Sequence, residues 1–346
     1  MVWNMPKKKL TAIDLFSGSG GLTLGLKHAG FRVIGAIDCD SLAVETFRAN
    51  HRGTVLWETD IQDLSVSEVS SRLSLRAGDL DLLAGCPPCQ GFSSIRTLNG
   101  KRNVDDPRNE LVFEFLRFIR NLEPKAIMME NVPGLAGDRR LAAFCKEIKK
   151  LGYSPVCEIL NAADFGVPQR RHRMVLLAGK YGKPNFAVPD PKRCTVRDAI
   201  ASLPPAGESN DCLHDFPEKR CARIMNLIKS IPKNGGSRRN IGAANQLDCH
   251  KRCNGFKDVY GRMAWEDVAP TITGGCVNPS KGRFLHPECD RAITLREAAL
   301  LQTFPKDYFF SLNRGKNSAA ELIGNALPPE FIRRHAIEIR NYIKAQ

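Results

Sequence analysis

Three kinds of reactive side chain stand beside predicted strands. Cys89 lies in the tract Gly-Cys-Pro-Pro-Cys-Gln-Gly-Phe-Ser at 85–93, directly after an apolar run. Glu130 follows a second apolar run, and Arg171 and Arg173 precede a third. We expect these strands to present a thiol, a carboxyl and guanidinium groups at one edge of an open sheet, where such sheets bind ligands. A thiol there can act as a nucleophile and a carboxyl as an acid or base.

A glycine-rich turn forms a second candidate site. Gly18, Gly20 and Gly21 follow the apolar run 10–16, so a ligand can approach the backbone closely at a helix N-terminus. The spacing departs from the dinucleotide fingerprint, and a tight structural turn explains the glycines about as well. However, Asp38 ends the next predicted strand, where an acidic side chain can accept hydrogen bonds from ribose hydroxyls. Together these features predict a nucleoside site.

Two interpretations of Asp60 remain open. It follows the expected third strand, where it would read the exocyclic amine of an adenine, or it caps a helix. No Walker lysine follows the glycines, so the ligand need not carry phosphate.

Length and composition limit the class of protein. The chain has 346 residues, 42% of them hydrophobic, which predicts one large domain with a smaller second one. No apolar run approaches the roughly 20 residues that cross a bilayer, and the first nine residues lack the apolar core of a signal peptide. We therefore expect a soluble, cytoplasmic protein with no membrane partner. The twelve cysteines have no regular pairing and are interpreted as reduced thiols.

The net charge of +14 indicates a polyanionic partner, because neutralising phosphates releases condensed counterions. Much of this charge is local. Between Lys219 and Arg262, eleven lysines and arginines stand against two aspartates. The stretch is rich in Asn and Gly and is expected to form exposed loops that bind nucleic acid. The alternative is a solvated charge run without a partner.

Apolar strands and amphipathic helices alternate through the first half of the chain, which predicts an α/β fold with a doubly wound, mostly parallel sheet. The regularity stops after Gly179, where prolines punctuate the chain, and returns with a helix at 294–302 and the tail from Pro329. We place a second, smaller, loop-rich domain between these points. The strands are expected near 10–16, 31–37, 80–84, 125–129, 155–160 and 173–179, and the helices near 22–29, 41–50, 110–122 and 139–151.

Six tracts together resemble the motifs of the C5-cytosine DNA methyltransferase family. They stand in that family's order and at its usual spacings: Asp14–Gly21, Pro87–Ser93, Glu130–Val132, Gln169–Arg173, Arg291–Pro305 and Gly324–Pro329. The remaining region, about 180–290, is where the family keeps its target-recognition domain, and it coincides with the basic stretch. The resemblance implies a Rossmann-like methyltransferase domain at 1–179 plus 292–346, with a target-recognition, DNA-binding domain at 180–291.

The resemblance also implies a reaction. A methyl group would pass from S-adenosyl-L-methionine to carbon 5 of cytosine in a specific duplex DNA sequence, after the base is flipped out of the helix. Cys89 would add to carbon 6 and turn the ring into a nucleophilic enamine. Glu130 would hold or protonate ring nitrogen 3. Arg171, supported by Arg173, would fix the carbonyl oxygen at position 2 or an adjacent phosphate. The base that removes the proton from carbon 5 is not identifiable.

Further site residues are carried over from the same resemblance and from the basic stretch. Family members often have a bulky aromatic after the acidic ribose ligand, and Cys39 departs from that pattern. The residues expected around the cofactor are Phe16, Gly18, Gly20, Gly21, Asp38, Cys39, Asp60, Ile61, Leu111, Asn325 and Ala326. The residues expected at the DNA are Gln90, Ser93, Thr271, Arg238 and Arg239.

Other functions were weighed against this one. Cys86-Pro-Pro-Cys89 fits a C-x-x-C redox pattern, and a reversible, inactivating disulfide between these thiols is a hypothesis. Zinc binding by Cys249, His250 and Cys253 lacks a second ligand pair, so no metal is expected. A tRNA cytosine-C5 methyltransferase of the same fold, and a DNA-binding repressor without catalysis, are the alternative functions.

The expected setting is a bacterial restriction-modification system, with the protein acting as a monomer in the cytoplasm, at the nucleoid. A cognate restriction endonuclease would act on the same sequence without a stable complex, although the sequence does not establish that one exists. The DNA target is not readable, because base contacts depend on which loop enters which groove.

Overall fold

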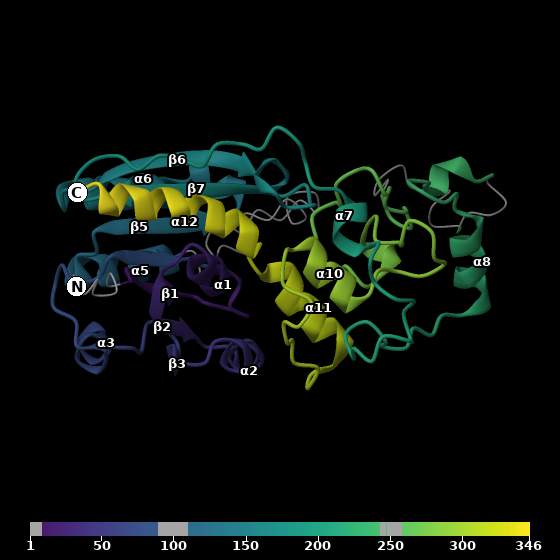
Figure 1. Cartoon of the computed structure of the whole chain (residues 1–346), viewed down its shortest axis with the longest axis horizontal. Helices are drawn as coiled ribbons and strands as arrows, with labels where there is room; N and C mark the ends of the chain where they lie inside the picture. Colours follow the sequence, from purple (N-terminus) through teal and green to yellow (C-terminus); the bar gives the residue numbers. More distant parts are fainter. Residues whose placement is uncertain (1–8, 89–109, 243–246, 248–257) are drawn as a thin grey trace, which may run out of the picture. The chain divides into compact units, whose positions relative to one another are not determined.

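The computed structural model describes residues 9–88, 110–242, 247 and 258–346. The chain divides into two compact units, labelled by their elements in Figure 1 and treated separately here. Unit 1 comprises Met1–Asn161, His172–Val188 and Pro329–Gln346, and unit 2 comprises Ala162–Arg171 and Pro189–Pro328. This division differs from the expected one, because residues 162–171 and 292–328 belong to the second unit and residues 180–188 belong to the first.

Unit 1 is built on a seven-stranded sheet with the strand order β3-β2-β1-β4-β5-β7-β6. The first five strands pair in parallel, while β7 is antiparallel to both β5 and β6. The expected doubly wound, mostly parallel sheet is therefore confirmed. The strands are β1 (Thr11–Leu15), β2 (Arg32–Asp38), β3 (Val55–Glu58), β4 (Leu82–Gly85), β5 (Ala126–Asn131), β6 (Ser154–Asn161) and β7 (His172–Gly179).

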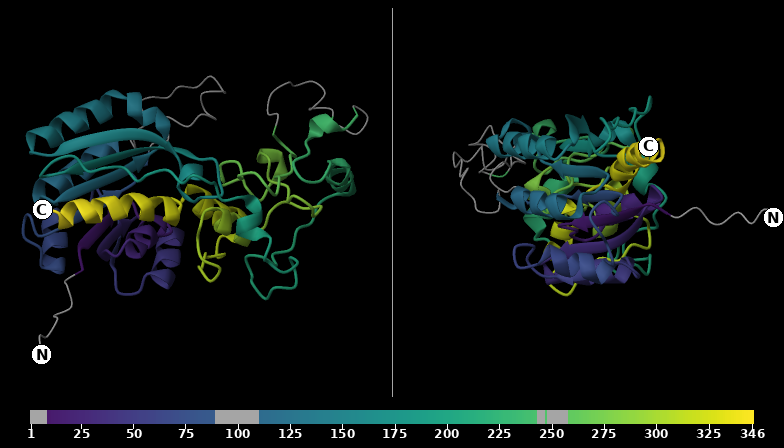
Figure 2. Two further views of the ribbon diagram at one scale, coloured as in Figure 1. Left: turned by 45° about the horizontal axis from the view of Figure 1, so that its top comes forward. Right: turned by 90° about the vertical axis from the view of Figure 1, so that its left-hand side faces the viewer.

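Helices cover both faces of this sheet, which explains why β1, β4 and β5 are buried along their whole length. In Figure 2, α1 and α12 lie on one face, and α5 and α6 lie on the other. The helices of unit 1 are α1 (Gly21–His28), α2 (Ser41–Asn50), α3 (Val66–Leu73), α5 (Leu111–Leu122), α6 (Arg139–Lys150), α12 (Pro329–Lys344) and the short 3-10 helix η3 (Pro133–Gly137).

The end of the chain packs against its beginning. Helix α12 lies along α1, and the two helices approach closely at Gly25. A Cβ atom at that position would lie 2.5 Å from the Cβ of Ile332 and 2.6 Å from the carbonyl oxygen of Pro329. The guanidinium of Arg340 also donates to the carbonyl of Ala29 at 2.8 Å. The first unit is therefore discontinuous in sequence, as expected, and its last helix completes the layer over β1.

Unit 2 consists of short helices joined by long loops. Its helix α8 was not expected, although its apolar residues recur at helical spacing and pack in a small core with Ile231, Tyr260 and Leu285. The elements are α7 (Val196–Ile200), α8 (Ala222–Ser230), α10 (Leu295–Leu301), α11 (Gly315–Asn325) and the 3-10 helices η4 (Ala162–Phe165), η5 (Arg238–Asn240) and η7 (Pro279–Lys281).

Arg262 ties this small core together. Its side chain is fully buried, and its guanidinium donates to the carbonyl oxygens of Ile228, Ile231 and His286 at 2.9–3.1 Å. It also pairs with Asp290 at 2.5 Å. The expectation that the whole basic stretch is exposed is therefore wrong in part, because this cation serves the interior of unit 2.

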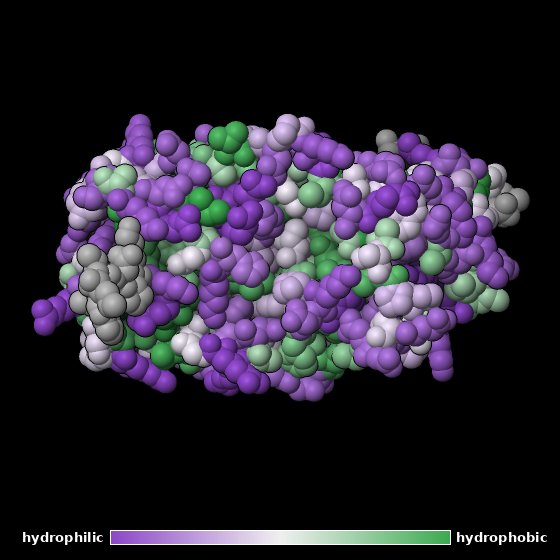
Figure 3. Space-filling view, in the orientation of Figure 1, coloured by the Kyte–Doolittle hydropathy of each residue, from purple (hydrophilic) through white to green (hydrophobic). Residues whose placement is uncertain are grey.

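The side of the molecule seen in Figure 3 is mostly hydrophilic, with apolar side chains in small separate patches. Across the described residues, no helix has the length and apolar character needed to cross a membrane.

The contact between α1 and α12 can be tested at Gly25. Alanine is the better helix former, but its Cβ would overlap α12, so we expect Gly25→Ala to lower the free energy of unfolding by about 1–3 kcal/mol. Gly137→Ala is the control, because a Cβ there meets nothing within 4 Å. Chemical denaturation measures both variants, and a Gly25→Ala protein as stable as the control would contradict the close packing described here.

Candidate active site

Glu130 is the centre of the first cluster. It lies near the carboxyl end of β5 and is only 1% exposed. Its Oε1 forms an ion pair with Nε of Arg173 at 3.0 Å. Glu130 is paired with Val175 across the antiparallel β5 and β7, so Arg173 is its diagonal neighbour on the same face of the sheet. The structure thus brings together two of the residues that the sequence predicts for catalysis.

Two hydrogen bonds join β5 to the segment that follows β4. Sγ of Cys86 donates to Oε2 of Glu130 at 3.1 Å. Nδ2 of Asn131 donates to the carbonyl oxygen of Pro87 at 2.8 Å. The start of the Pro-Pro-Cys tract is therefore held beside Glu130. The predicted nucleophile and DNA contacts of this tract lie outside the described residues: Cys89, Gln90 and Ser93.

Arg171 has different partners from those expected. It belongs to unit 2 and is 2% exposed. One terminal nitrogen donates to the carbonyls of Ile272 and Gly324 at 3.0 and 3.1 Å, and the other donates to the carbonyl of Ala326 at 3.2 Å. These bonds correct the expected order of the two arginines. Both terminal nitrogens of Arg171 donate to backbone carbonyls, whereas Arg173 faces the carboxyl group of Glu130.

The glycine turn and Asp38 make the direct contact that their spacing predicts. Oδ2 of Asp38 accepts a hydrogen bond from the backbone N–H of Gly18 at 2.7 Å. Phe16 has a φ of 63°, and Gly18 and Gly20 have φ of 54° and 92°, so the chain turns sharply between β1 and α1. Glycine adopts this left-handed region without the steric cost that a Cβ atom brings, which explains why Gly18 and Gly20 are glycines. The turn leaves Asp38 beside an open backbone surface.

Asp14 and Ser17 provide buried polar groups under this turn. Oδ2 of Asp14 accepts from the hydroxyl of Thr23 at 2.6 Å. Among the described residues, Oδ1 of Asp14 and the hydroxyl oxygen of Ser17 are buried and have no hydrogen-bond partner. Burial, with a smaller contribution from the charge of Asp38, raises the pKa of Asp14 to about 8. Such orphaned groups are expected where a polar ligand completes the site.

His51 supports the turn from α2, a role that the sequence analysis missed. Its Nε2 lies 3.1 Å from the carbonyl oxygen of Gly20, and its Nδ1 lies 3.4 Å from Nζ of Lys27. Burial, followed by the charge of Lys27, lowers the pKa of His51 to about 3, so the ring is neutral. The geometry then assigns the proton to Nε2, which donates to Gly20, and leaves Nδ1 to accept from Lys27. No local pattern marks a partner 31 residues away.

The residues expected near the adenine lie at the carboxyl edge of the sheet or next to it. Burial, followed by the charges of Asp38 and Asp60, raises the pKa of Cys39. Oδ1 of Asp60 accepts from the backbone N–H of Gln62 at 2.9 Å, so it closes a turn and does not cap α3. Ile61 is buried, and Leu111 is half-buried at the start of α5. Asn325 and Ala326 end α11 in unit 2, so their place at the cofactor stays a prediction.

The candidate DNA-binding residues of unit 2 differ in exposure. Arg238 is buried, with 6% of its surface exposed, which argues against its predicted role at DNA, whereas Arg239 is exposed. The hydroxyl of Thr271 donates to the carbonyl of Arg170 at 2.7 Å. The buried amide of Gln169 accepts from the backbone N–H of Ile272 at 2.8 Å, so this threonine segment is rigidly held.

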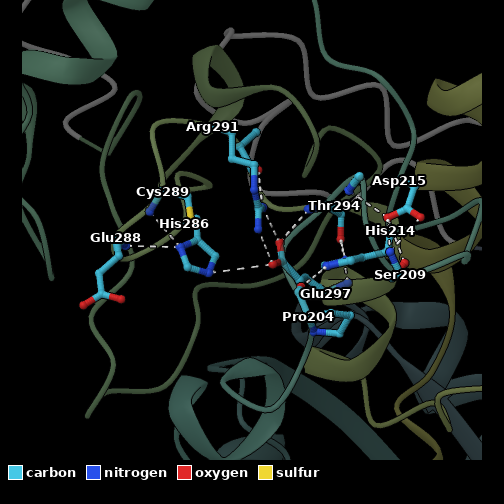
Figure 4. Close-up of polar contacts among 12 residues, drawn as sticks. Pro204, Ser209, His214, Asp215, His286, Glu288, Cys289, Arg291, Thr294 and Glu297 are labelled. Carbon is cyan, nitrogen blue, oxygen red and sulfur yellow. Dashed lines mark hydrogen bonds and ion pairs between the residues drawn. The ribbon is translucent and has the colours of Figure 1, made fainter.

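The tract that begins at Arg291 organises unit 2, as Figure 4 shows. Glu297 accepts two hydrogen bonds from Arg291 at 2.7 Å and one from the backbone N–H of Thr294 at 2.8 Å. The Thr294 hydroxyl in turn lies 2.9 Å from Nδ1 of His214, and Nε2 of His286 lies 3.7 Å from Glu297. Burial acts to raise the pKa of Glu297, but Arg291 holds it below its ordinary value. This tract therefore has a structural task within unit 2.

The other residue clusters add no metal site. No group of three or more His, Cys, Asp or Glu suited to a metal ion occurs within the described part of the chain. The weighed zinc candidates lie outside it: Cys249, His250 and Cys253.

Comparison with known proteins gives consistent matches over almost the whole chain. The family model described as C-5 cytosine-specific DNA methylase matches residues 10–341. The Type II methylase M.HgiDII of Herpetosiphon aurantiacus is 37% identical over 352 residues, covering 96% of this chain and 95% of that protein. The Type II methyltransferase M1.HphI of Haemophilus parahaemolyticus is 36% identical over 330 residues, covering 92% of this chain and 84% of that protein. The solved structure of the Entamoeba histolytica methyltransferase EhMeth shares the fold, with a TM-score of 0.63 at 16% identity, covering 97% of this chain and 99% of that one.

The raised pKa of Asp14 predicts a pH-dependent stability. Folding favours the protonated carboxyl, so its contribution is complete below about pH 4 and is lost as the pH rises towards 8. One such proton changes the free energy of unfolding by at most about 1.4 kcal/mol per pH unit. We expect Asp14→Asn to remove this slope between pH 5 and 8. Urea unfolding across that range measures it, with the exposed Asp63→Asn as control, and an unchanged slope in Asp14→Asn would refute the assignment.

Proposed function

This chain belongs to the C-5 cytosine-specific DNA methylase family, and from that premise we propose that it methylates cytosine within one specific duplex DNA sequence, as the modification enzyme of a bacterial type II restriction-modification system. DNA is its substrate, and S-adenosylmethionine is its methyl donor. Its relatives M.HgiDII and M1.HphI are a type II methylase and a type II methyltransferase, which supports the modification role. The observation that carries the proposed site is the buried Glu130, paired with Arg173 and bonded to Cys86.

The proposed mechanism begins with the reactivity of cytosine. Carbon 5 is a poor nucleophile while the ring stays conjugated, so a thiolate must first add to carbon 6. We assign that thiolate to Cys89, which is outside the described residues. The addition places negative charge on the ring, and Glu130 disperses it by holding or protonating ring nitrogen 3. The hydrogen bond between Asn131 and Pro87 supports this assignment, because it holds Pro87, two residues before Cys89 in the sequence, beside β5.

The two arginines have different proposed roles. Arg173 orients the Glu130 carboxyl, and its guanidinium is the group we assign to the base carbonyl at position 2. Arg171 instead positions backbone, because it holds the segments at Ile272, Gly324 and Ala326 together. A planar guanidinium suits both tasks, since it donates several hydrogen bonds in fixed directions.

The glycine turn fits S-adenosylmethionine. The orphaned Oδ1 of Asp14 and the Ser17 hydroxyl are buried polar atoms that a polar ligand would satisfy. Asp38 is placed to accept from ribose hydroxyls, and Asp60 and Ile61 are assigned to the adenine. The remaining proposed cofactor residues are Phe16, Gly18, Gly20, Gly21, Cys39, Leu111, Asn325 and Ala326. The cofactor, when bound, supplies an electrophilic methyl group.

Unit 2 is the proposed target-recognition unit. The exposed Arg239 and the rigidly held Thr271 are its candidate contacts to the DNA backbone. We further propose that the enzyme acts as a monomer at the bacterial nucleoid, and that a cognate endonuclease cuts the same sequence without forming a stable complex with it.

The mechanism predicts a covalent intermediate on DNA that contains 5-fluorocytosine. Fluorine cannot leave as a proton does, so an adduct should accumulate on the wild-type enzyme and not on Cys89→Ala. Bisulfite sequencing of DNA from cells that express the enzyme first identifies the target sequence. Denaturing gels with a labelled duplex of that sequence then detect the adduct, and labelled methyl transfer to tRNA is measured in parallel. A Cys89→Ala variant that still methylates would overturn the mechanism. Methylation of tRNA instead of DNA would favour the tRNA enzyme, and DNA binding with no transfer would favour a repressor.

The roles of the two arginines predict opposite phenotypes. Arg173→Lys keeps a charge beside Glu130 but loses the planar fork, so we expect kcat to fall at least about tenfold with little change in stability. Arg171→Met leaves three buried carbonyls without this donor and should lower the free energy of unfolding by roughly 3 kcal/mol. Methylation kinetics and denaturant unfolding on both variants check the pair. The assignment fails if Arg171→Met is stable but inactive.

A further inference from the structure

The register of β4 and β5 brings residue 86 to Glu130. The strands are parallel, and Gly85 is paired with Met129. The next residues along each strand, Cys86 and Glu130, therefore project from the same face of the sheet. The backbone N–H of Cys86 donates to the carbonyl of Leu15 at 3.3 Å, which fixes the direction of its side chain. The 3.1 Å bond from the thiol to Oε2 follows from this register.

The thiol and the guanidinium hold opposite oxygens of one buried carboxyl. Arg173 faces Oε1 at 3.0 Å, and Cys86 donates to Oε2. A carboxylate that is 1% exposed needs such donors, because water cannot replace them. Because the thiol donates to one oxygen and the Arg173 cation lies beside the other, the plane of the carboxyl is constrained as well as its position.

The same contact makes Cys86 a poor nucleophile. A neighbouring carboxylate disfavours the thiolate, whereas reactive thiols stand in electropositive surroundings. The sulfur therefore remains a hydrogen-bond donor.

We propose that Cys86 is a positioning residue for the methylation reaction, whose thiol sets the plane of the Glu130 carboxyl for ring nitrogen 3 of the flipped cytosine. This inference rests on the proposed role of Glu130. Cys86 touches neither the reacting carbon atoms nor the methyl donor, and it acts only through the carboxyl group.

The test compares Cys86→Ala and Cys86→Ser. A thiol is a weak donor, so we expect Cys86→Ala to lower the single-turnover rate of methylation and of adduct formation on 5-fluorocytosine DNA about 3- to 10-fold. The hydroxyl of Cys86→Ser should restore most of the rate. The KM for S-adenosylmethionine should stay unchanged. Cys145→Ala is the control, because that thiol is also half-buried in unit 1 but lies on α6.

A double-mutant cycle with Glu130→Gln separates positioning from a merely structural role. If Cys86 acts through the carboxyl, adding Cys86→Ala to Glu130→Gln should change the rate by less than about twofold. The inference is overturned if Cys86→Ala alone matches wild type, or if it costs as much in the Glu130→Gln background. A Glu130→Gln enzyme with the wild-type rate would instead refute the proposed role of Glu130, and this inference with it.

Discussion

The buried ion pair between Glu130 and Arg173 is the interaction on which the active site depends. A carboxyl group that is 1% exposed is tolerated only because a guanidinium lies 3.0 Å away. The reversed direction of β7 supplies that cation. Since β7 is antiparallel to β5, its first residues lie at the edge where β5 ends. In an all-parallel sheet, Arg173 would lie at the opposite edge, and Glu130 would have no counter-charge from this strand.

The cofactor end of the sheet follows a related rule. Side chains from other elements stabilise the turn after β1. Asp38 at the end of β2 accepts from Gly18, and His51 after α2 donates to Gly20. Asp38 and His51 belong to the β2 side of β1 in the strand order. On the other side of β1, β4 leads into Cys86 and β5 carries Glu130. The reversal of strand order at β1 therefore separates the residues proposed for the nucleoside from those proposed for catalysis.

Long-range packing explains where the sequence-based expectations were incomplete. Arg171 and Arg173 are two residues apart in a basic tract, and nothing local shows that one enters unit 2 while the other faces β5. The basic stretch predicts that Arg262 is a surface cation, but five carbonyl or carboxylate groups surround it inside unit 2. Helix α8 could have been predicted from the helical spacing of its apolar residues, but the charged residues around it favoured a prediction of loops.

The sequence by itself determined the alternation of strands and helices, the mostly parallel sheet and the family, and it supplied the candidate reactive groups, because strand apolarity, turn glycines and motifs act over a few residues. Tertiary structure alone decided the partners of those groups. The pairing of Cys86 and Arg173 with Glu130, and of His51 with Gly20, depends on strand order, strand direction and register. These are set by how the whole core packs, and a linear pattern does not carry them.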